Sequence, residues 1–411
     1  FLLTTGVWVA LPLFGAIPLM MGATELRFVD AVFEAMSGLT TTGSTVVSGL
    51  DDLPDGILLW RGLLQWLGGI GIVVVAMVFL PELRVGGMQI FRSEGFDTMG
   101  KILPRATEIA RSISVIYVAL TLACALGYML VGQSVFDATV HAMTTVATGG
   151  FANYDASFGT LGAGSEYVAV LFMVLAALPF VRYVQLIAGQ YDAPWRDPQV
   201  RGFLMTAALL SSALFAWKLG QTGYEGEEAL RKTLFNTVSL LTGTGYASED
   251  YMGWGAFPVA VLFFAGLIGG CAGSTACSIK IFRYQLLFSS IQVQLQRIRS
   301  PHGIFTPRYG GKPVSPDVLT SVISFFVFFT VSLGLLAVGL GLTGLDFTTS
   351  VSGAATALAN VGPGLGDTIG PAGNFAPLND AAKWMLIAGM LIGRLELMAV
   401  YVLFTFRFWR A

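Results

Sequence analysis

Glycine recurs in four loops, accompanied by threonine in three of them and by asparagine in the fourth, and these residue types suit the binding of a dehydrated cation. The loops end near residues 43, 150, 245 and 362. Backbone carbonyls can replace the hydration shell of an ion if the chain turns them toward one axis. Glycine permits the positive φ that this turn requires, and threonine fills the space behind the loop. We therefore predict that one ion-binding ring is built from Thr41, Thr42, Gly43, Thr148, Gly149, Gly150, Thr244, Gly245, Asn360, Val361 and Gly362.

The first two loops belong to an internal repeat that includes the segment before each loop. Six residues recur at the same offsets: Asp30, Ala31, Ala35, Met36, Thr41 and Gly43 match Asp137, Ala138, Ala142, Met143, Thr148 and Gly150. The third and fourth copies are more diverged but occupy the same place between apolar segments. A single Thr-Gly loop is more often an ordinary helix-ending turn. Four copies on one side of the membrane favour a pseudo-fourfold pore.

A short helix is expected before each loop, with its C-terminal end pointing at the centre of the membrane. Such an end carries partial negative charge, which stabilises a cation and repels an anion. We expect Asp30 and Asp137 to cap the N-termini of the first two short helices rather than to bind the ion. His141, inside the second short helix, could relay protons, although a histidine packed against neighbouring helices is the commoner case.

The elements that position these loops are apolar helices long enough to cross a bilayer. A hydrocarbon core of about 30 Å needs roughly 20 helical residues. Eight segments qualify: 1–21, 57–80, 112–132, 166–189, 202–219, 256–282, 318–342 and 381–405. The predicted fold is an all-α polytopic membrane protein in which four pseudo-symmetric repeats of span, short helix, loop and span surround a central pore. The repeats cover 1–80, 112–189, 202–282 and 318–411, with cytoplasmic loops at 81–111 and 283–317.

The composition excludes several classes of protein. Hydrophobic residues make up 55% of the chain and charged residues only 12%, about half the charged fraction of soluble domains. A net charge of −2 leaves no basic excess with which to bind nucleic acid. The three cysteines lie in apolar or glycine-rich segments and indicate no disulfide framework. A membrane-embedded hydrolase is the alternative from the enzyme class. Neither histidine, His141 or His302, has a catalytic partner nearby in the sequence, so we predict that the chain is not an enzyme.

The distribution of charge orients the chain in the membrane, because basic residues accumulate in cytoplasmic loops. Sixteen of the 23 Lys and Arg residues follow the second, fourth or sixth span or lie in the C-terminal tail. Acidic residues show the opposite trend, which places the glycine loops on the outer side in an acidic vestibule that includes Glu249 and Asp250. A negative vestibule would concentrate cations. An ordinary solvated acidic surface explains the same pattern equally well.

The sixth and eighth spans contain candidates for an inner barrier. Glycine disfavours a helix by about 1 kcal/mol per position, so the small-residue cluster at 266–275 is expected to unwind. Close packing of small residues between helices is the alternative. In the eighth span, Arg394 is an intramembrane cation that would form an electrostatic barrier below the ring or, alternatively, pin neighbouring helices. The candidate gate comprises Gly269, Gly270, Cys271, Ala272, Gly273, Ser274, Thr275 and Arg394.

These motifs resemble those of the Trk/Ktr/HKT superfamily of potassium transporters, in particular its bacterial TrkH branch. The most specific segments are 36–43, 147–151, 242–246 and 360–366, together with 83–95, 269–275 and 393–397. The resemblance implies that each repeat contributes one filter glycine: Gly43, Gly150, Gly245 and Gly362. Plant relatives that prefer sodium carry serine at the first position, so Gly43 favours potassium. Discrimination against sodium is expected to be weaker than in tetrameric potassium channels.

The function implied by the resemblance is potassium uptake across the bacterial inner membrane, with the filter facing outward and potassium as the bound ion. Rubidium and, weakly, sodium could also pass. A sodium-permeable protein or a sodium- or proton-coupled symporter is the closest alternative. The resemblance also implies contact with membrane lipid, a homodimer, and a cytosolic nucleotide-binding regulatory subunit of the TrkA type that could dock on the basic loop at 283–315. Arg394 and the small-residue loop would block the path in the closed state.

Overall fold

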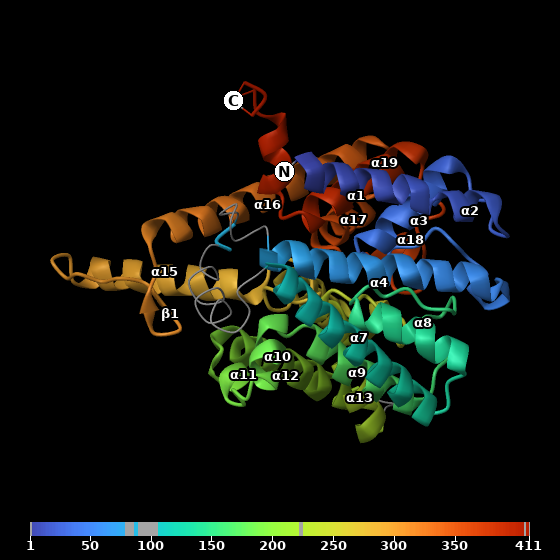
Figure 1. The fold of residues 1–411 in the computed structure, drawn as a ribbon, viewed down its shortest axis with the longest axis horizontal. Helices are drawn as coiled ribbons and strands as arrows, with labels where there is room; N and C mark the ends of the chain where they lie inside the picture. Colours follow the sequence, from blue (N-terminus) through green and yellow to red (C-terminus); the bar gives the residue numbers. More distant parts are fainter. Residues whose placement is uncertain (1, 79–85, 89–105, 222–224, 407, 411) are drawn as a thin grey trace.

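The computed structural model describes residues 2–78, 86–88, 106–221, 225–406 and 408–410. These residues form helices and connecting loops, apart from one two-stranded antiparallel sheet. The sheet pairs β1 (Arg308–Tyr309) with β2 (Lys312–Pro313). Long apolar helices run roughly side by side through the molecule (Figure 1). The predicted all-α membrane architecture is therefore confirmed.

Five helical segments are long and apolar enough to cross a membrane by themselves, among the described residues. They are the pair α1 (Leu2–Gly15) and α2 (Ile17–Met21), and the single helices α4 (Asp55–Val78), α7 (Ala106–Leu130), α12 (Pro198–Leu219) and α16 (Pro316–Leu342). They match five of the eight predicted spans. However, α7 begins at Ala106, inside the predicted cytoplasmic loop 81–111. Most of the remainder of that loop, 81–85 and 89–105, lies outside the described residues.

The fourth and eighth predicted spans are not continuous helices. α9 (Ala163–Ala176) and α10 (Phe180–Ile187) meet at a bend of 85°. Pro179 lies at this break, where it has no N–H to continue a helix. The last span divides in the same way, because α19 (Asp380–Arg394) and the segment Met398–Phe404 differ in direction by 105°. That segment comprises α20 (Met398–Tyr401) and η4 (Val402–Phe404).

The sixth predicted span, 256–282, is interrupted by a non-helical segment. α14 (Ala256–Ile268) is an apolar helix of only 13 residues, and the next helix, α15 (Ile281–Arg299), begins after residues 269–280. The small-residue cluster unwinds as predicted, although Gly266 stays helical and the interruption continues to Lys280. α15 projects from one end of the molecule (Figure 1). Residues 283–299 of the predicted loop 283–317 therefore belong to this helix, and the β1–β2 hairpin follows.

A short helix precedes each glycine loop, as predicted: α3 (Phe28–Leu39), α8 (Val135–Val146), α13 (Gly226–Thr242) and α17 (Phe347–Ala359). The prediction that Asp30 and Asp137 cap the first two is wrong. Both are the third residue of their helix, and the cap of α8 is Ser134, whose hydroxyl accepts from the N–H of Asp137. A carboxylate in the first helical turn still interacts favourably with the helix dipole. Asp30 also binds Lys383 of α19 at 2.6 Å.

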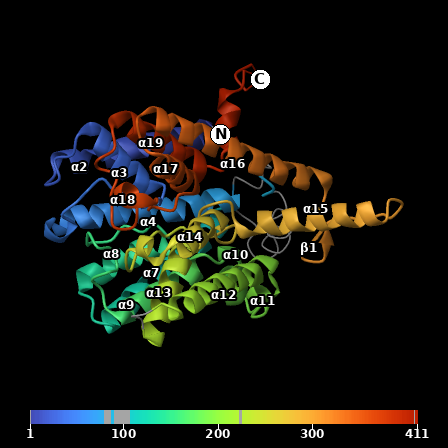
Figure 2. The same ribbon diagram turned by 180° about the vertical axis from the view of Figure 1, so that it is seen from behind.

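Packing between the repeats closes into a ring. We call α1–α4 repeat 1, α7–α10 repeat 2, α12–α14 repeat 3 and α16–α19 repeat 4. The helix after each loop packs on the short helix of the following repeat: α4 on α8, α9 on α13, α14 on α17, and α19 on α3. The last of these contacts joins repeat 4 to repeat 1, which lie side by side in both views (Figure 1 and Figure 2). The ends of the four short helices consequently meet around one centre.

Candidate functional site

The four loops share one backbone geometry. We call residues 41–43, 148–150, 243–245 and 360–362 ring loops 1 to 4. The first residue of each has a left-handed φ of 50° to 77°, and the glycine at the third position has a φ of 80° to 99°. The N–H of the middle residue donates to a carbonyl five residues earlier in all four loops, at 2.8–3.1 Å. A left-handed φ is uncommon for a β-branched residue, so Thr41 and Thr148 hold strained conformations.

The ring loops contact one another in cyclic order through their glycines. A Cβ atom added to Gly43, Gly150 or Gly245 would lie less than 3.0 Å from a backbone carbonyl oxygen of the next loop, and one on Gly362 would do the same to Thr42 of loop 1. The carbonyl always belongs to the middle residue of the neighbouring loop. Only glycine therefore fits at these positions, for reasons of both φ and space. The four predicted filter glycines do lie together.

Four equivalent carbonyl groups in the ring have no partner among the residues that the structure describes. The carbonyl oxygens of Thr41, Thr148, Gly243 and Asn360 accept no hydrogen bond from any described residue. These residues are buried. More than 90% of buried backbone carbonyls in proteins have a partner, so four unpaired carbonyls at equivalent positions are exceptional. Sequence reasoning missed Gly243, because glycine stands there where loops 1 and 2 have threonine.

Side-chain hydroxyls support the loops from behind. Thr42 hydrogen-bonds Thr40 at 2.7 Å, and Thr244 hydrogen-bonds Thr242 at 2.8 Å. The amide of Asn360 donates to the Thr42 hydroxyl at 2.9 Å and thereby joins loop 4 to loop 1. The predicted role of threonine behind the loop therefore agrees with these contacts.

Gln65 of α4 fixes ring loop 2 from the side, and sequence reasoning missed it. Its Nε2 donates to the carbonyl of Gly149 at 2.5 Å, and its Oε1 accepts from the N–H of Phe151 at 3.0 Å. Gln65 is fully buried. A polar side chain inside an apolar span is a signal of function or of a specific partner, and this signal was available in the sequence.

A buried ion pair joins the segments that follow ring loops 1 and 2. Arg61 of α4 binds Glu34 of α3 at 2.9 Å, and the exposed fraction of both side chains is 2% or less. Glu34 also accepts from Thr45 and from the N–H of Val46, while Arg61 donates to the carbonyl of Ala152. Removing one partner of such a pair would leave an uncompensated buried charge. The pair therefore stabilises the first two loops relative to each other.

A cavity adjoins the ring and is lined by residues that directly follow the ring loops, such as Ser44, Phe151 and Pro363. All four ring glycines line it, and Asp155 is the acidic residue in its lining. The Asp155 carboxylate accepts from the N–H groups of Gly49 and Leu50. Glu249 and Asp250, which were expected in the outer vestibule, are not among the residues that line this cavity. Glu249 instead binds Lys218 and Trp254, and Asp250 caps η3 (Tyr251–Trp254).

Residues 269–280, the barrier loop, lie against the first residues of the ring loops. Cys277 Sγ is 3.6 Å from the hydroxyl of Thr41 in loop 1. Its Cβ is 3.3 Å from the point where a Cβ of Gly243, in loop 3, would stand. Loops 1 and 3 belong to opposite repeats, so Cys277 lies under the middle of the ring. The loop is also bonded to repeat 2, because Thr275 donates from both N and Oγ1 to the carbonyl of Ala176.

Arg394, the last residue of α19, contacts the barrier loop directly. Its Nη1 donates to the carbonyl of Thr275 at 3.4 Å and to Cys277 Sγ. Its Nε and Nη2 have no hydrogen-bond partner among the described residues, although the residue is only 4% exposed. A buried guanidinium with free donors places positive charge beneath the ring. The structure therefore brings Arg394 and the small-residue cluster together.

A second buried cluster anchors the far end of the barrier loop. Glu396 binds Lys280 at 2.9 Å and also binds Arg283 of α15. Both Glu396 and Lys280 have left-handed φ values, of 62° and 75°. The cluster ties the break after α19 to the start of α15.

His141, Cys271 and Cys277 are buried side chains. His141 is fully buried, with Nδ1 hydrogen-bonded to Gln133 and Nε2 accepting from the N–H of Asn153. We predicted from the sequence that His141 packs against neighbouring helices rather than relaying protons, and its buried position is consistent with packing. Cys271 and Cys277 are free thiols, and the described residues contain no group of three or more His, Cys, Asp or Glu side chains that could hold a metal ion.

Comparisons with known proteins agree with this architecture. The profile of the TrkH family, described as "Cation transport protein", matches residues 1–409. The chain is 49% identical over its whole length to the Trk system potassium uptake protein TrkI of Halomonas elongata, of which it covers 84%. It is 37% identical to the Trk system potassium uptake protein TrkH of Vibrio parahaemolyticus, of which it covers 86%.

A solved structure shows the same fold. The crystal structure of the potassium transporter TrkH from Vibrio parahaemolyticus matches the whole chain with a TM-score of 0.91 and 35% sequence identity, and the match covers 85% of that protein. A family profile over nearly the full length, relatives above 30% identity and a common fold lead to one conclusion. The chain belongs to the TrkH family of cation transport proteins.

Proposed function

We propose that this chain takes up potassium ions through the ring of four loops. The observation that carries the proposal is the set of equivalent buried carbonyls of Thr41, Thr148, Gly243 and Asn360, which accept no hydrogen bond from the described residues. A dehydrated monovalent cation on the axis would provide their missing partner. The names of the relatives, which are potassium uptake proteins, support potassium as that ion.

Selectivity in this proposal depends on the backbone. Each ring glycine lies against a carbonyl of the next loop, so the diameter of the ring is determined by direct backbone contact. A side chain at any of these positions would displace a carbonyl and change the ring. Because Gly43 is a glycine, loop 1 has the same backbone geometry as the other three loops. The resulting ring is symmetric, which favours potassium, whereas a distorted ring would admit sodium.

The barrier loop and Arg394 are proposed to close the path below the ring. Cys277 lies beneath opposite loops, and the adjacent guanidinium of Arg394 repels a second cation in a medium of low dielectric constant. Hydrogen bonds attach the barrier loop to repeats 2 and 4, among them those from Thr275 to Ala176 and from Arg394 to Thr275. Movement of this loop away from the axis would open the path.

Flux into proteoliposomes tests the proposal directly. We expect uptake of potassium and rubidium to exceed uptake of sodium without a requirement for a sodium or proton gradient. Uptake that stops when such a gradient is removed would favour the symporter alternative. Absence of uptake of any of the three ions by correctly folded protein would contradict the proposal as a whole.

The substitution Gly43→Ser tests the ring as the filter. We expect sodium permeation to rise relative to potassium, because the added side chain would crowd the carbonyl of Gly149. Thr45→Ser is the matched control, since serine keeps the hydroxyl that donates to Glu34 at 2.9 Å. If both variants have the ion preference of the parent protein, the ring is not the filter.

We further propose that the protein is a homodimer in the bacterial inner membrane, with the ring toward the outside and contacts to lipid. The predominance of Lys and Arg in the opposite loops supports this orientation. A regulatory subunit of the TrkA type would dock on the projecting α15 and the hairpin, where Arg297, Arg299 and Arg308 are exposed. Arg283 is fully buried and does not belong to this surface. Charge reversal of Arg297 and Arg299 should weaken copurification with that subunit.

A further inference from the structure

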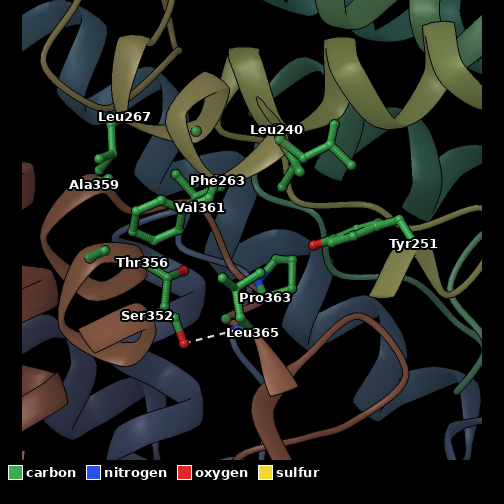
Figure 3. A pocket seen from close by; sticks show the side chains of 14 residues that line it. Leu240, Tyr251, Phe263, Leu267, Ser352, Thr356, Ala359, Val361, Pro363 and Leu365 are labelled. Carbon is green, nitrogen blue, oxygen red and sulfur yellow. Dashed lines mark hydrogen bonds between the residues drawn. The ribbon is translucent and has the colours of Figure 1, made fainter. Parts of the chain in front are cut away.

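A second cavity lies between repeats 3 and 4, beside the ring rather than on its axis. Its walls come from α14, α17, the end of α13 and the segment that follows ring loop 4 (Figure 3). Leu240, Leu262, Phe263 and Leu267 give it an apolar lining on the repeat 3 side. α14 is a short helix, and Phe263 and Leu267 on it are only partly buried. This wall of the cavity is therefore partly exposed at the outside of the helix bundle.

Among the described residues, the polar side chains that line this cavity have protein partners, with one exception. Ser352 donates to the carbonyl of Thr348 at 2.7 Å and accepts from the N–H of Leu365 at 2.9 Å. Thr356 donates to the carbonyl of Gly362 at 3.0 Å. The phenol of Tyr251 forms no hydrogen bond with any described residue, although the residue is only 1% exposed. Its hydroxyl points into the cavity (Figure 3).

An apolar lining together with one phenol that has no partner among the described residues suits the binding of an amphiphile. Apolar cavities with few polar groups bind ligands whose orientation those polar groups determine, and a buried phenol nearly always has a hydrogen-bond partner. A ligand that satisfies both conditions has an apolar chain and one oxygen that can accept a hydrogen bond. Its oxygen would bind Tyr251, and its chain would follow α14 toward Leu267 and Ala359.

We propose that this cavity binds a single fatty acyl chain, with the acyl oxygen hydrogen-bonded to the phenol of Tyr251. The bound chain would contact Val361 and Pro363 of the fourth loop segment on one side and the helix that leads into the barrier loop on the other. The site thus adjoins both parts of the proposed ion path. The inference concerns a different ligand and a different cavity, so it stands whether or not potassium is the transported ion.

Photolabelling of the full-length protein in phosphatidylcholine bilayers tests the proposal. Two probes are compared: palmitic acid with a diazirine near the end of its chain, and phosphatidylcholine that carries the same diazirine chain. Adducts are mapped by mass spectrometry. We expect one probe to form more adducts with Phe263, Leu267 or Leu365 than with Phe264. Phe264 is 62% exposed and serves as the reference for nonspecific lipid contact. Labelling by the acid indicates a free fatty acid, and labelling by the phospholipid indicates a lipid chain.

The substitution Tyr251→Phe distinguishes a site from a passive crevice. Loss of the hydrogen bond should reduce labelling of the cavity roughly three- to tenfold, and unlabelled probe should compete in the parent protein. Tyr167→Phe is the matched control, because that phenol is 40% exposed and donates to Glu227 instead. Ala355→Leu, which fills the cavity, should abolish labelling. Equal labelling of Phe263 and Phe264 by both probes, or labelling unchanged in Tyr251→Phe and Ala355→Leu, would overturn the proposal.

Discussion

The ring loops and the barrier loop differ in how the chain holds them. Each ring loop follows a short helix and has a positive φ at its first and third positions. It contacts the neighbouring loops through backbone atoms. The barrier loop is a single segment that is held by backbone hydrogen bonds to other segments and, in addition, by side chains that include Arg394, Thr275 and Glu396. Changes of backbone geometry should therefore damage the ring, and changes of side chains should loosen the barrier.

The largest effect is expected for Gly150→Ala in the ring. An alanine at this φ of 80° is strained, and its Cβ would collide with the carbonyl of Thr244. Strain of about 1–2 kcal/mol together with the collision should lower potassium uptake on the order of a hundredfold. Uptake by reconstituted protein, normalised to folded protein, is the measurement.

Gly132→Ala is the matched control for this substitution. Gly132 has a φ of 98° but no atom within 4 Å of an added Cβ, so the variant carries the strain without the collision. Its uptake should remain close to that of the parent protein. A similar loss in both variants would show that left-handed strain, and not contact within the ring, determines the effect.

A smaller effect of opposite sign is expected for Arg394→Ala in the barrier. Removing a buried charge beneath the ring should raise basal potassium uptake on the order of tenfold. The ratio of potassium to sodium uptake should not change, because the carbonyl ring is intact. Arg394→Lys, which keeps the charge, is the control. Unchanged or reduced uptake in folded Arg394→Ala would make the arginine a packing residue, and a changed ion ratio would place it in the filter.

Cys277 should have an intermediate effect, because it holds Arg394 through one contact. In Cys277→Ala, Arg394 keeps only the carbonyl of Thr275 as a partner within the described structure, and basal uptake should rise roughly two- to fivefold. Cys277→Ser retains an acceptor at the same position and should behave like the parent protein. If serine and alanine raise uptake equally, the sulfur does not position the arginine.

The smallest effect is expected at the mouth of the ring. Asp155→Asn removes the negative charge from the cavity that the ring glycines line, and should lower uptake at low potassium less than about twofold at low ionic strength. The difference should vanish in physiological salt, where the Debye length is about 8 Å. Glu249→Gln is the comparison, because Glu249 binds Lys218 away from this cavity. A loss for Asp155→Asn that is independent of salt would indicate structural damage instead.

Local patterns made the ring loops predictable. Asp, Ala, Met, Thr and Gly recur at fixed offsets in the first two repeats, which indicates that both loops have the same turn. The positive φ at Gly43 or Gly150 depends on the glycine itself and on its neighbours in the chain. The interruption near Gly269 was also visible, since small residues weaken a helix locally. The breaks at Pro179 and after Arg394 were not predicted, because the hydropathy of both segments continues across them.

Contacts between distant residues were beyond the reach of the sequence. The charge pattern predicted an acidic outer side that includes Glu249 and Asp250, but it could not show that both have local partners or that Asp155 lines the cavity at the ring. Glu396 and Lys280 are 116 residues apart and meet only because α19 breaks beside the barrier loop. A polar residue in an apolar span was visible in the sequence at Gln65, but its partner, Gly149, was not, because Gly149 belongs to another repeat.

The sequence by itself determined the apolar helices, the four loops and the glycines within them, because hydropathy, helix ends and a positive φ depend on residues close together in the chain. The tertiary structure decided which carbonyl each glycine meets, that Cys277 lies beneath opposite loops, and which donors of Arg394 remain free. These are properties of surfaces brought together by packing the four repeats in a ring. The physical reason for the division is range: backbone conformation is selected locally, while burial and pairing depend on the whole fold.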